Sequence, residues 1–123
     1  MALSIYTLGA RGLELDIAGK LEEEDYLDFT PMAEAKIKEF GDINLLIRTS
    51  GFSGWSPSAL WEDLKFDVRH YDDVDRLALV SESEDDEWMA TVSKPFTSAN
   101  VKHFVEDDLD RARRWVLGRD ESL

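Results

Sequence analysis

Short apolar runs alternate with longer amphipathic stretches along most of the chain, and this order restricts the possible folds to a few. We expect strands at residues 4–8, 13–17, 43–47, 76–80 and 101–105. We expect helices at residues 23–40, 58–71, 85–93 and 107–117, with a Gly- and Ser-rich loop at residues 49–57. Strands that alternate with helices at this spacing form βαβ units. The pattern therefore predicts an α/β domain with four helices and a five-stranded mixed, mostly parallel sheet.

The first elements are specified in more detail. Residues 4–8 and 13–17 are close enough to form a hairpin, so the first strand is expected at an antiparallel edge of the sheet. The second of these strands alternates, with Leu13, Leu15 and Ile17 on one face. The first helix places five apolar side chains on one face: Tyr26, Phe29, Ala33, Ile37 and Phe40. Pro31 lies within this helix and Gly41 ends it.

Composition excludes several classes of function. The 123 residues suffice for one domain, expected at residues 1–118 with a frayed tail at residues 119–123. Fourteen basic against 27 acidic residues give a net charge of −13, which repels nucleic-acid backbones and allows at most transient contact with anionic membranes. The sequence has no Cys, so disulfides and thiolate metal sites are excluded. No apolar segment approaches the roughly 18 residues that span a bilayer, so we expect a cytoplasmic protein.

Several segments, in their order and spacing, resemble the SpoIIAA-like family over nearly the whole chain. They are Glu24-Asp25-Tyr26, Pro31, Leu45-Leu46-Ile47, Phe52-Ser53-Gly54-Trp55, Leu60-Trp61-Glu62-Asp63, Arg76-Leu77-Ala78-Leu79-Val80, Trp88, Lys94-Pro95-Phe96, Phe104 and Ala112-Arg113-Arg114-Trp115. The resemblance implies a fold related to STAS domains (sulphate transporter and anti-sigma factor antagonist), and with it regulatory protein contacts. A looser likeness to lipid-carrier folds implies an apolar ligand or a membrane contact.

One segment departs from the related anti-sigma antagonists. Those proteins carry a phosphorylatable Ser directly after an Asp, where the helix that follows the third strand begins. Here residues 48–55 read Arg-Thr-Ser-Gly-Phe-Ser-Gly-Trp, and no Asp precedes a Ser. The departure argues against a switch of that kind.

An apolar patch is expected on the second helix and the loop before it. On a helical wheel Ala59 and Phe66 lie together with Trp55, on roughly the opposite side from the stripe assigned to the core. With Phe52 they form a candidate surface for a ligand or a partner. The alternative is that Trp55 folds down against the helix as a staple and that Phe66 is singly exposed.

Three serines lie close to the start of the second helix. Ser50, Ser53 and Ser56 each carry a hydroxyl that is able to cap the helix, and a phosphate there would be favoured by the helix dipole. Capping is the preferred interpretation.

Catalytic and metal-binding patterns are sparse. Asp63, Asp67 and His70 share one helical face near Asp73, and carboxylates with an imidazole are able to hold a divalent cation. The alternative is a solvated face of a very acidic protein, which we prefer. Nothing resembles a nucleophile elbow or a phosphate-binding loop. We therefore expect no cofactor and no bound metal.

The sequence thus favours a non-enzymatic regulatory or protein-interaction module. A homodimer is expected, with an apolar small molecule or a basic protein as further possible partners. The first alternative is an apolar-ligand carrier or peripheral membrane binder that uses Phe52, Trp55, Ala59 and Phe66. The second alternative is a metal-assisted enzyme at Asp63, Asp67 and His70.

Overall fold

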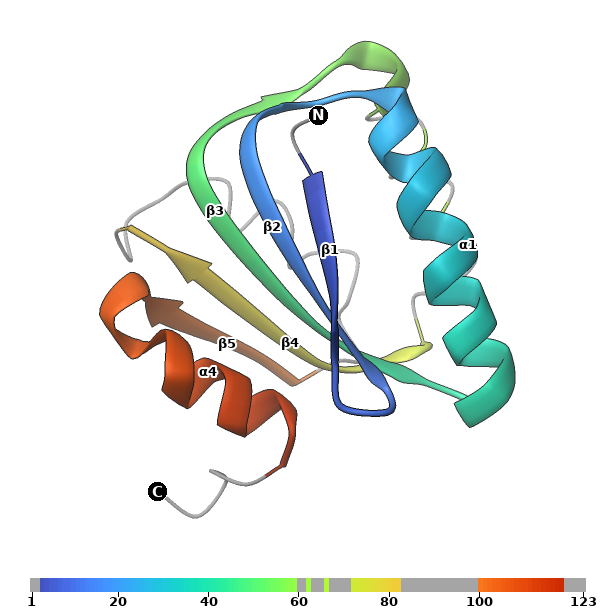
Figure 1. The fold of residues 1–123 in the computed structure, drawn as a ribbon, viewed down its shortest axis with the longest axis vertical. Coiled ribbons are helices and arrows are strands. Elements are labelled where there is room, and N and C mark those ends of the chain that lie inside the picture. The colour runs from blue at the N-terminus through green and yellow to red at the C-terminus, as the bar shows by residue number, and fades with distance from the viewer. Residues whose placement is uncertain (1–2, 60–61, 63–65, 67–71, 83–99, 119–123) are drawn as a thin grey trace.

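The computed structural model describes residues 3–59, 62, 66, 72–82 and 100–118, with only the backbone described at residues 52–55. A five-stranded sheet in the order β1-β2-β3-β4-β5 forms its centre (Figure 1). The strands are β1 Leu3–Leu8, β2 Gly12–Leu21, β3 Ile43–Trp55, β4 Val74–Ser81 and β5 Asn100–Val105. The pair β1–β2 is antiparallel and the other three pairs are parallel. This confirms the expected mixed sheet with an antiparallel edge strand.

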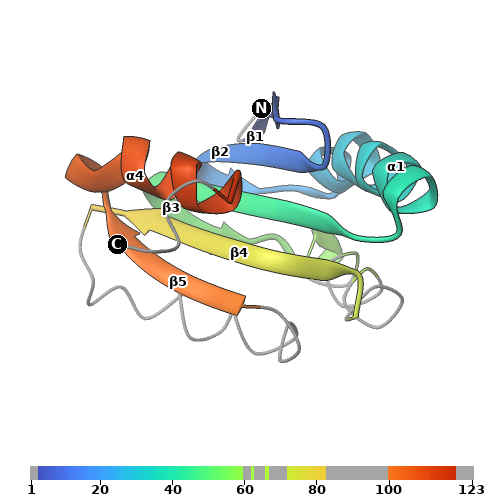
Figure 2. The same ribbon diagram turned by 90° about the horizontal axis from the view of Figure 1, so that it is seen from below.

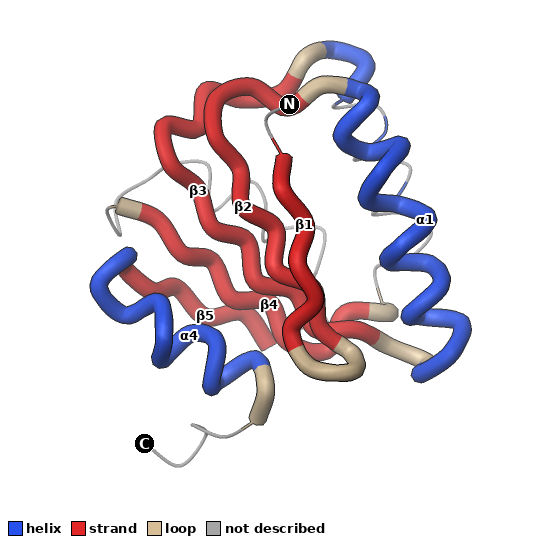
Figure 3. The backbone as a smooth tube through the Cα atoms, in the orientation of Figure 1, coloured by secondary structure: helices blue, strands red, loops and turns tan. Residues whose placement is uncertain are grey.

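The hairpin between β1 and β2 is tight (Figure 3). Gly9 begins its turn at a φ of 72°, a conformation that side chains with a Cβ disfavour. Gly12 begins β2, and a Cβ there would lie 2.2 Å from the carbonyl oxygen of Leu8. Glycine at these two positions therefore lets the chain reverse within three residues and pair β1 with β2.

One face of the sheet packs on α1, Glu23–Phe40, whose bounds match the sequence expectation. The Asp25 carboxylate accepts a hydrogen bond from the N–H of Glu22 at 2.8 Å, and Gly41 ends the helix at a φ of 91°. The core on this side contains Leu13, Leu15, Ile17, Tyr26, Phe29, Ala33, Leu45, Ile47, Leu77 and Leu79. Phe40, expected in the core, is exposed. Burial decreases along the helix from Ala33, which is fully buried, through Ile37, which is partly buried, so the last turn of α1 lies beyond the core.

The other face packs on α4, Leu109–Val116, which follows the short 3₁₀ helix η2, Glu106–Asp108. A second core lies between them and contains Leu46, Ala78, Val80, Phe104, Ala112, Trp115 and Val116. Figure 2 shows the twist of the sheet and α4 lying along β3 and β4, against which it mainly packs. The expected helix near the C-terminus is confirmed, and α1 and α4 cover opposite faces.

Three expectations need correction or lie outside the described residues. The loop expected at residues 49–57 is wrong, because β3 continues to Trp55. Its second half pairs with the second half of β2, for example Ala18 with Ser50, so inter-strand hydrogen bonds extend a segment that has no apolar alternation of its own. Residues 57–59, 62 and 66 are helical, in agreement with the second helix. The helix expected at residues 85–93 and the tail at residues 119–123 lie outside the described residues.

In the part of the chain that the structure describes, no helix combines the length and the apolar character needed to cross a bilayer.

Candidate functional site

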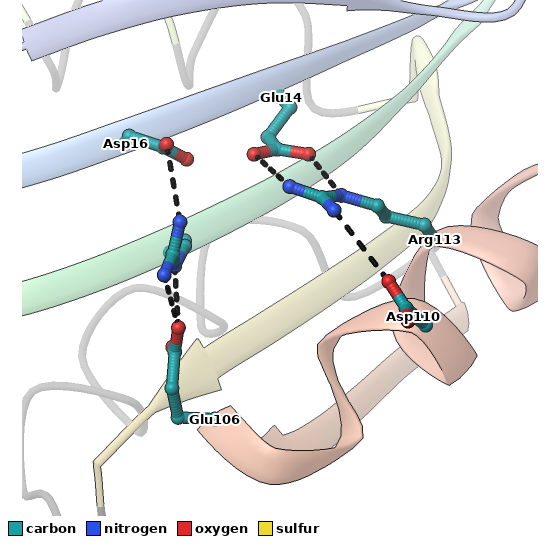
Figure 4. A network of polar contacts seen from close by, with 6 residues as sticks. Glu14, Asp16, Glu106, Asp110 and Arg113 are labelled. Carbon is teal, nitrogen blue, oxygen red and sulfur yellow. Dashed lines mark hydrogen bonds and ion pairs between the residues drawn. The ribbon is translucent and has the colours of Figure 1, made fainter.

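A group of charged side chains lies on the α4 face of the sheet. Glu14 and Asp16 alternate along β2 with the apolar residues that face α1, so both carboxylates point to the opposite side. Asp16 pairs in register with Arg48 of β3. Two acidic residues and one arginine thus lie on a face that continues, on β3 and β4, into the apolar core under α4. We call these side chains, with Glu106 and Arg113, the charged network (Figure 4).

Arg113 fixes α4 to the sheet through Glu14. Its Nε donates to Oε1 of Glu14 at 2.7 Å, and its Nη2 donates to Oε2 at 3.0 Å. The Glu14 side chain is almost fully buried, whereas Arg113 is about one-third exposed. This two-point contact is the strong geometry for a guanidinium and a carboxylate, and it joins residues 99 positions apart.

Arg48 makes the second connection, between the sheet and η2. Its Nε donates to Oε1 of Glu106 at 2.7 Å, and its Nη2 contacts the same oxygen. Its Nη1 lies 3.5 Å from Oδ2 of Asp16, a longer ion pair. The other oxygen of Asp16, Oδ1, is buried and has no hydrogen-bond partner among the described residues. Asp16 is therefore the least satisfied member of the charged network.

The two neighbouring carboxyls have pKa values displaced in opposite directions. Burial, followed by the adjacent Glu14, raises the pKa of Asp16 to about 6. Burial also disfavours the charged form of Glu14, but the hydrogen bond and charge of Arg113 outweigh it and lower the pKa of Glu14. When the pair carries a single proton, these opposite displacements place it on Asp16 and leave Glu14 charged.

The part of this face that α4 leaves uncovered reaches solvent. Tyr6 lies opposite Glu14 on β1 and is 54% exposed, and Ser4 lies opposite Asp16. We define the open face as Ser4, Tyr6, Asp16, Ala18, Arg48 and Ser50. Four of these side chains are exposed, and Asp16 and Arg48 are partly buried. The open face and the charged network share Asp16 and Arg48.

The expected apolar surface patch is contradicted at two of its four residues. Ala59 is fully buried, and Phe66 is 2% exposed with its ring centroid 5.1 Å from that of Phe29 on α1. The wheel grouped Ala59 and Phe66 correctly, but this side of the helix faces the core instead of solvent. Phe52 and Trp55 lie in β3, and their side chains are outside the description.

The three serines have different positions. Ser56 caps the second helix, because its hydroxyl accepts a hydrogen bond from the N–H of Ala59 at 3.1 Å and Pro57 follows at the first helical position. The capping expectation is confirmed for Ser56. Ser50 and Ser53 lie within β3, so neither is placed to cap the helix. Whether any of the three is phosphorylated stays a prediction, and Ser56 is buried.

The described residues offer no group suited to a metal ion, and they line an acidic depression. Among them, no group of three or more His, Asp or Glu side chains is placed to hold a metal ion. The candidate residues Asp63, Asp67 and His70 lie outside the described residues. An open depression of about 490 Å³ is lined by Glu22, Glu23, Glu24, Leu27 and Ser58. Its acidic lining does not favour an apolar ligand.

Sequence reasoning missed the charged network although a signal was present. Strands covered by helices on both sides normally carry apolar residues on both sides. Glu14, Asp16 and Arg48 interrupt that pattern at neighbouring positions on two adjacent strands. Charged residues in such strands need partners of opposite charge, and Arg113 in the last helix supplies one.

Comparison with known proteins agrees with this fold. The sequence model of the SpoIIAA-like family matches residues 13–117. No curated protein matches the chain. Among solved structures, the chain is similar to an uncharacterised protein of the DUF3478 family from Shewanella loihica PV-4, which has a SpoIIAA-like fold. The two share 32% identity over 94% of this chain and 92% of the other, with a TM-score of 0.72.

The resemblance inferred from the sequence is therefore confirmed. The SpoIIAA-like fold supports a regulatory protein-interaction role in general, and neither comparison carries a more specific one. Because the family model covers most of its length, the chain belongs to the SpoIIAA-like family.

Proposed function

We propose that the chain is a non-enzymatic regulatory module that binds another protein through the open face. The observation that carries the proposal is the position of the charged network, half covered by α4 and half continuous with an exposed strip of β1, β2 and β3. Charged groups with displaced pKa values at the edge of an accessible surface are typical of functional sites. They would not be needed to fold this sheet, whose other face packs mainly through apolar side chains where α1 covers it.

The composition of the open face favours a protein partner. Tyr6 offers a large exposed ring, Arg48 offers a partly exposed guanidinium, and Ser4, Ala18 and Ser50 are small enough for close approach. Tyr and Arg are enriched at the centres of protein interfaces. An apolar small molecule would need an enclosed cavity, which the acidic depression beside α1 does not supply.

A second copy of the chain is one partner that fits this face. β1 is an edge strand, paired only with β2 among the described strands, so its outer backbone groups are available to another strand. The net charge of −13 opposes self-association and favours a basic protein instead. Sedimentation at two salt concentrations separates these partners, because screening strengthens a homodimer of this charge and weakens a complex with a basic protein.

The direct test places a photo-crosslinking residue at Tyr6 in the native cell. The matched control position is Leu27, which is 61% exposed on α1. We expect one defined protein to be joined at Tyr6 and not at Leu27. That protein, prepared pure, should bind the wild-type chain and lose affinity at least about tenfold for Tyr6→Ser, since a central interface Tyr commonly contributes more than 1.4 kcal/mol.

Two outcomes contradict the proposal. One is crosslinking of the same proteins at Tyr6 and at Leu27. The other is equal affinity of the purified partner for wild type and for Tyr6→Ser. Turnover of a small molecule by the pure chain, lost in Arg48→Ala, would replace the binding function with an enzymatic one.

A further inference from the structure

The charged network contains one more carboxylate than guanidinium. Glu14, Asp16 and Glu106 contact Arg48 and Arg113. A fourth carboxylate, Asp110, lies 3.7 Å from Arg113 but is 86% exposed, so water largely screens it. The partly buried charges balance when one of the three inner carboxyls holds a proton.

Hydrogen bonding decides which carboxyl takes that proton. Glu14 accepts from Arg113 at both oxygens, and Glu106 accepts twice from Arg48 at one oxygen. From the guanidiniums, Asp16 receives only the 3.5 Å ion pair to Arg48, and its Oδ1 accepts no hydrogen bond from a described residue. A proton on Asp16 leaves the hydrogen bonds of Glu14 and Glu106 intact. The burial of Asp16 beside Glu14 agrees with this choice, since both raise its pKa.

Within the described part of the chain, the surroundings of Asp16 contain no other group that reverses this balance. β1 contributes Tyr6 and Ser4 opposite the two carboxyls, and β3 contributes Arg48. At the register of Arg48, β4 contributes only the apolar Val80. The remaining facing charges come from the last segment of the described chain, namely Glu106 of η2 and Asp110 and Arg113 of α4.

We propose that Asp16 and Glu14 form a proton-linked latch that controls how firmly residues 106–116 are held to the sheet. With Asp16 protonated, the network is balanced, and Arg48 and Arg113 hold Glu106 and Glu14. With Asp16 ionised, it repels Glu14 and competes with Glu106 for Arg48, so both contacts between the segment and the sheet weaken. No bond other than the O–H of Asp16 forms or breaks.

The latch deepens the proposed function, on which its role in partner binding rests. Asp16 and Arg48 belong both to the open face and to the charged network. A change in protonation therefore alters the surface presented to a partner and the mobility of the segment beside it. The latch itself is measured on the chain alone, so its failure and the failure of the proposed function are distinguishable.

The first measurement is a carboxyl carbon NMR titration of the wild-type chain. We expect the Asp16 signal to titrate with a midpoint of about 6. A midpoint at or below the ordinary Asp value of 3.8 overturns the proposal. This measurement needs no variant and so does not depend on any variant folding.

The second measurement is amide hydrogen exchange in α4, corrected for the intrinsic effect of pH. If opening of the segment returns Asp16 to its ordinary pKa, linkage raises the opening constant by up to about tenfold between about pH 5 and pH 7.5. In Asp16→Asn, which cannot ionise, this rise should disappear. Asp28→Asn, which makes the same charge change on the exposed side of α1, should keep it.

The decisive quantity is the difference between wild type and Asp16→Asn, because every other titratable group is common to both proteins. A rise of less than about twofold in wild type, or an equal rise in Asp16→Asn, overturns the latch. A normal titration of Asp16 near 6 without any change in α4 exchange also overturns it, because the proton would then not control the segment.

Discussion

The two faces of the sheet are stabilised by different means. Where α1 lies, the buried strand side chains are mostly apolar, with the neutral Thr49 and Ser81 among them, and Phe29 of α1 packs on Phe66 of the second helix. Where α4 lies, the apolar core includes Leu46 of β3 and Val80 of β4. Beside it, on β2 and β3, the charged network takes the place of apolar side chains. Apolar contacts are insensitive to pH, whereas the charged network has carboxyl pKa values displaced in both directions. The two faces of one sheet therefore differ in the chemistry that holds their helices, and the proposed latch concerns the α4 face alone.

The largest expected effect comes from breaking the α1 face at Phe66. Truncation of a buried Phe typically costs about 3–5 kcal/mol, because transfer energy is lost and a cavity remains. We therefore expect Phe66→Ala to lower the free energy of unfolding by about 3–5 kcal/mol, measured by urea denaturation. Phe40→Ala, at an exposed Phe of α1, is the control and should change it by less than about 0.5 kcal/mol. Equal losses of stability in the two variants would mean that Phe66 is no more buried than Phe40.

The second effect comes from breaking the charged network between Glu14 and Arg113. Arg113→Met removes the guanidinium and leaves the buried Glu14 carboxylate without its two donors. We expect a loss of about 2–3 kcal/mol, below the value for a fully buried pair because Arg113 is partly exposed.

A double variant separates the pair from its parts. In Glu14→Gln with Arg113→Met no unpaired charge remains, so the loss should be smaller than the sum of the two single losses by at least about 1 kcal/mol. Additive losses would mean that the two side chains do not interact. The ion pair would then contribute nothing to the stability of the α4 face.

Sequence periodicity was sufficient to predict those helices and strands whose pattern of buried residues is set by local spacing. The bounds of α1 and the existence and order of the five strands follow from local spacing, because side chains repeat every 3.6 residues in a helix and every two in a strand. The extension of β3 to Trp55 does not follow, because Thr49 to Gly54 has no apolar alternation and becomes a strand only by pairing with β2.

The candidate site was less predictable for the same reason. A helical wheel grouped Ala59 with Phe66 but carried no information on which side meets α1. The alternation of Leu13 to Ile17 placed Glu14 and Asp16 together, yet their neighbours Arg48, Glu106 and Arg113 come from segments far away in sequence. Contacts between distant segments decide both cases, and local spacing in a single sequence does not reveal them.

The third effect sharpens the difference in pH response. The folded pKa of Asp16, about 6, is above its ordinary value of 3.8, so Asp16 stabilises the fold below 3.8 and this stabilisation is lost as pH rises through about 6. Between about pH 5 and pH 7.5 the loss is up to about 1.4 kcal/mol. The lowered pKa of Glu14 acts oppositely, since its stabilisation is present above 4.5 and lost at lower pH.

We therefore expect the network to stabilise the fold most between about pH 3.8 and pH 4.5, and Asp16→Asn to lack the loss at higher pH. Urea denaturation of both proteins at several pH values measures this. If the free energy of unfolding changes with pH equally in wild type and in Asp16→Asn, Asp16 does not contribute to the pH dependence.

The smallest effect compares the two faces with one change of the same kind. Ser56→Ala removes the cap of the helix that carries Phe66 to the α1 face, and the buried N–H of Ala59 loses its acceptor. Loss of such a cap typically costs about 1 kcal/mol. Ser50→Ala, on the open face of β3, removes an exposed hydroxyl that caps no helix and should change the free energy of unfolding by less than about 0.5 kcal/mol.

If Ser50→Ala instead weakens partner binding while Ser56→Ala does not, the same residue type has a structural role on one face and a binding role on the other. Losses of equal size in stability would mean that the open face is as firmly packed as the α1 face, and it would then be unsuited to exchange a partner.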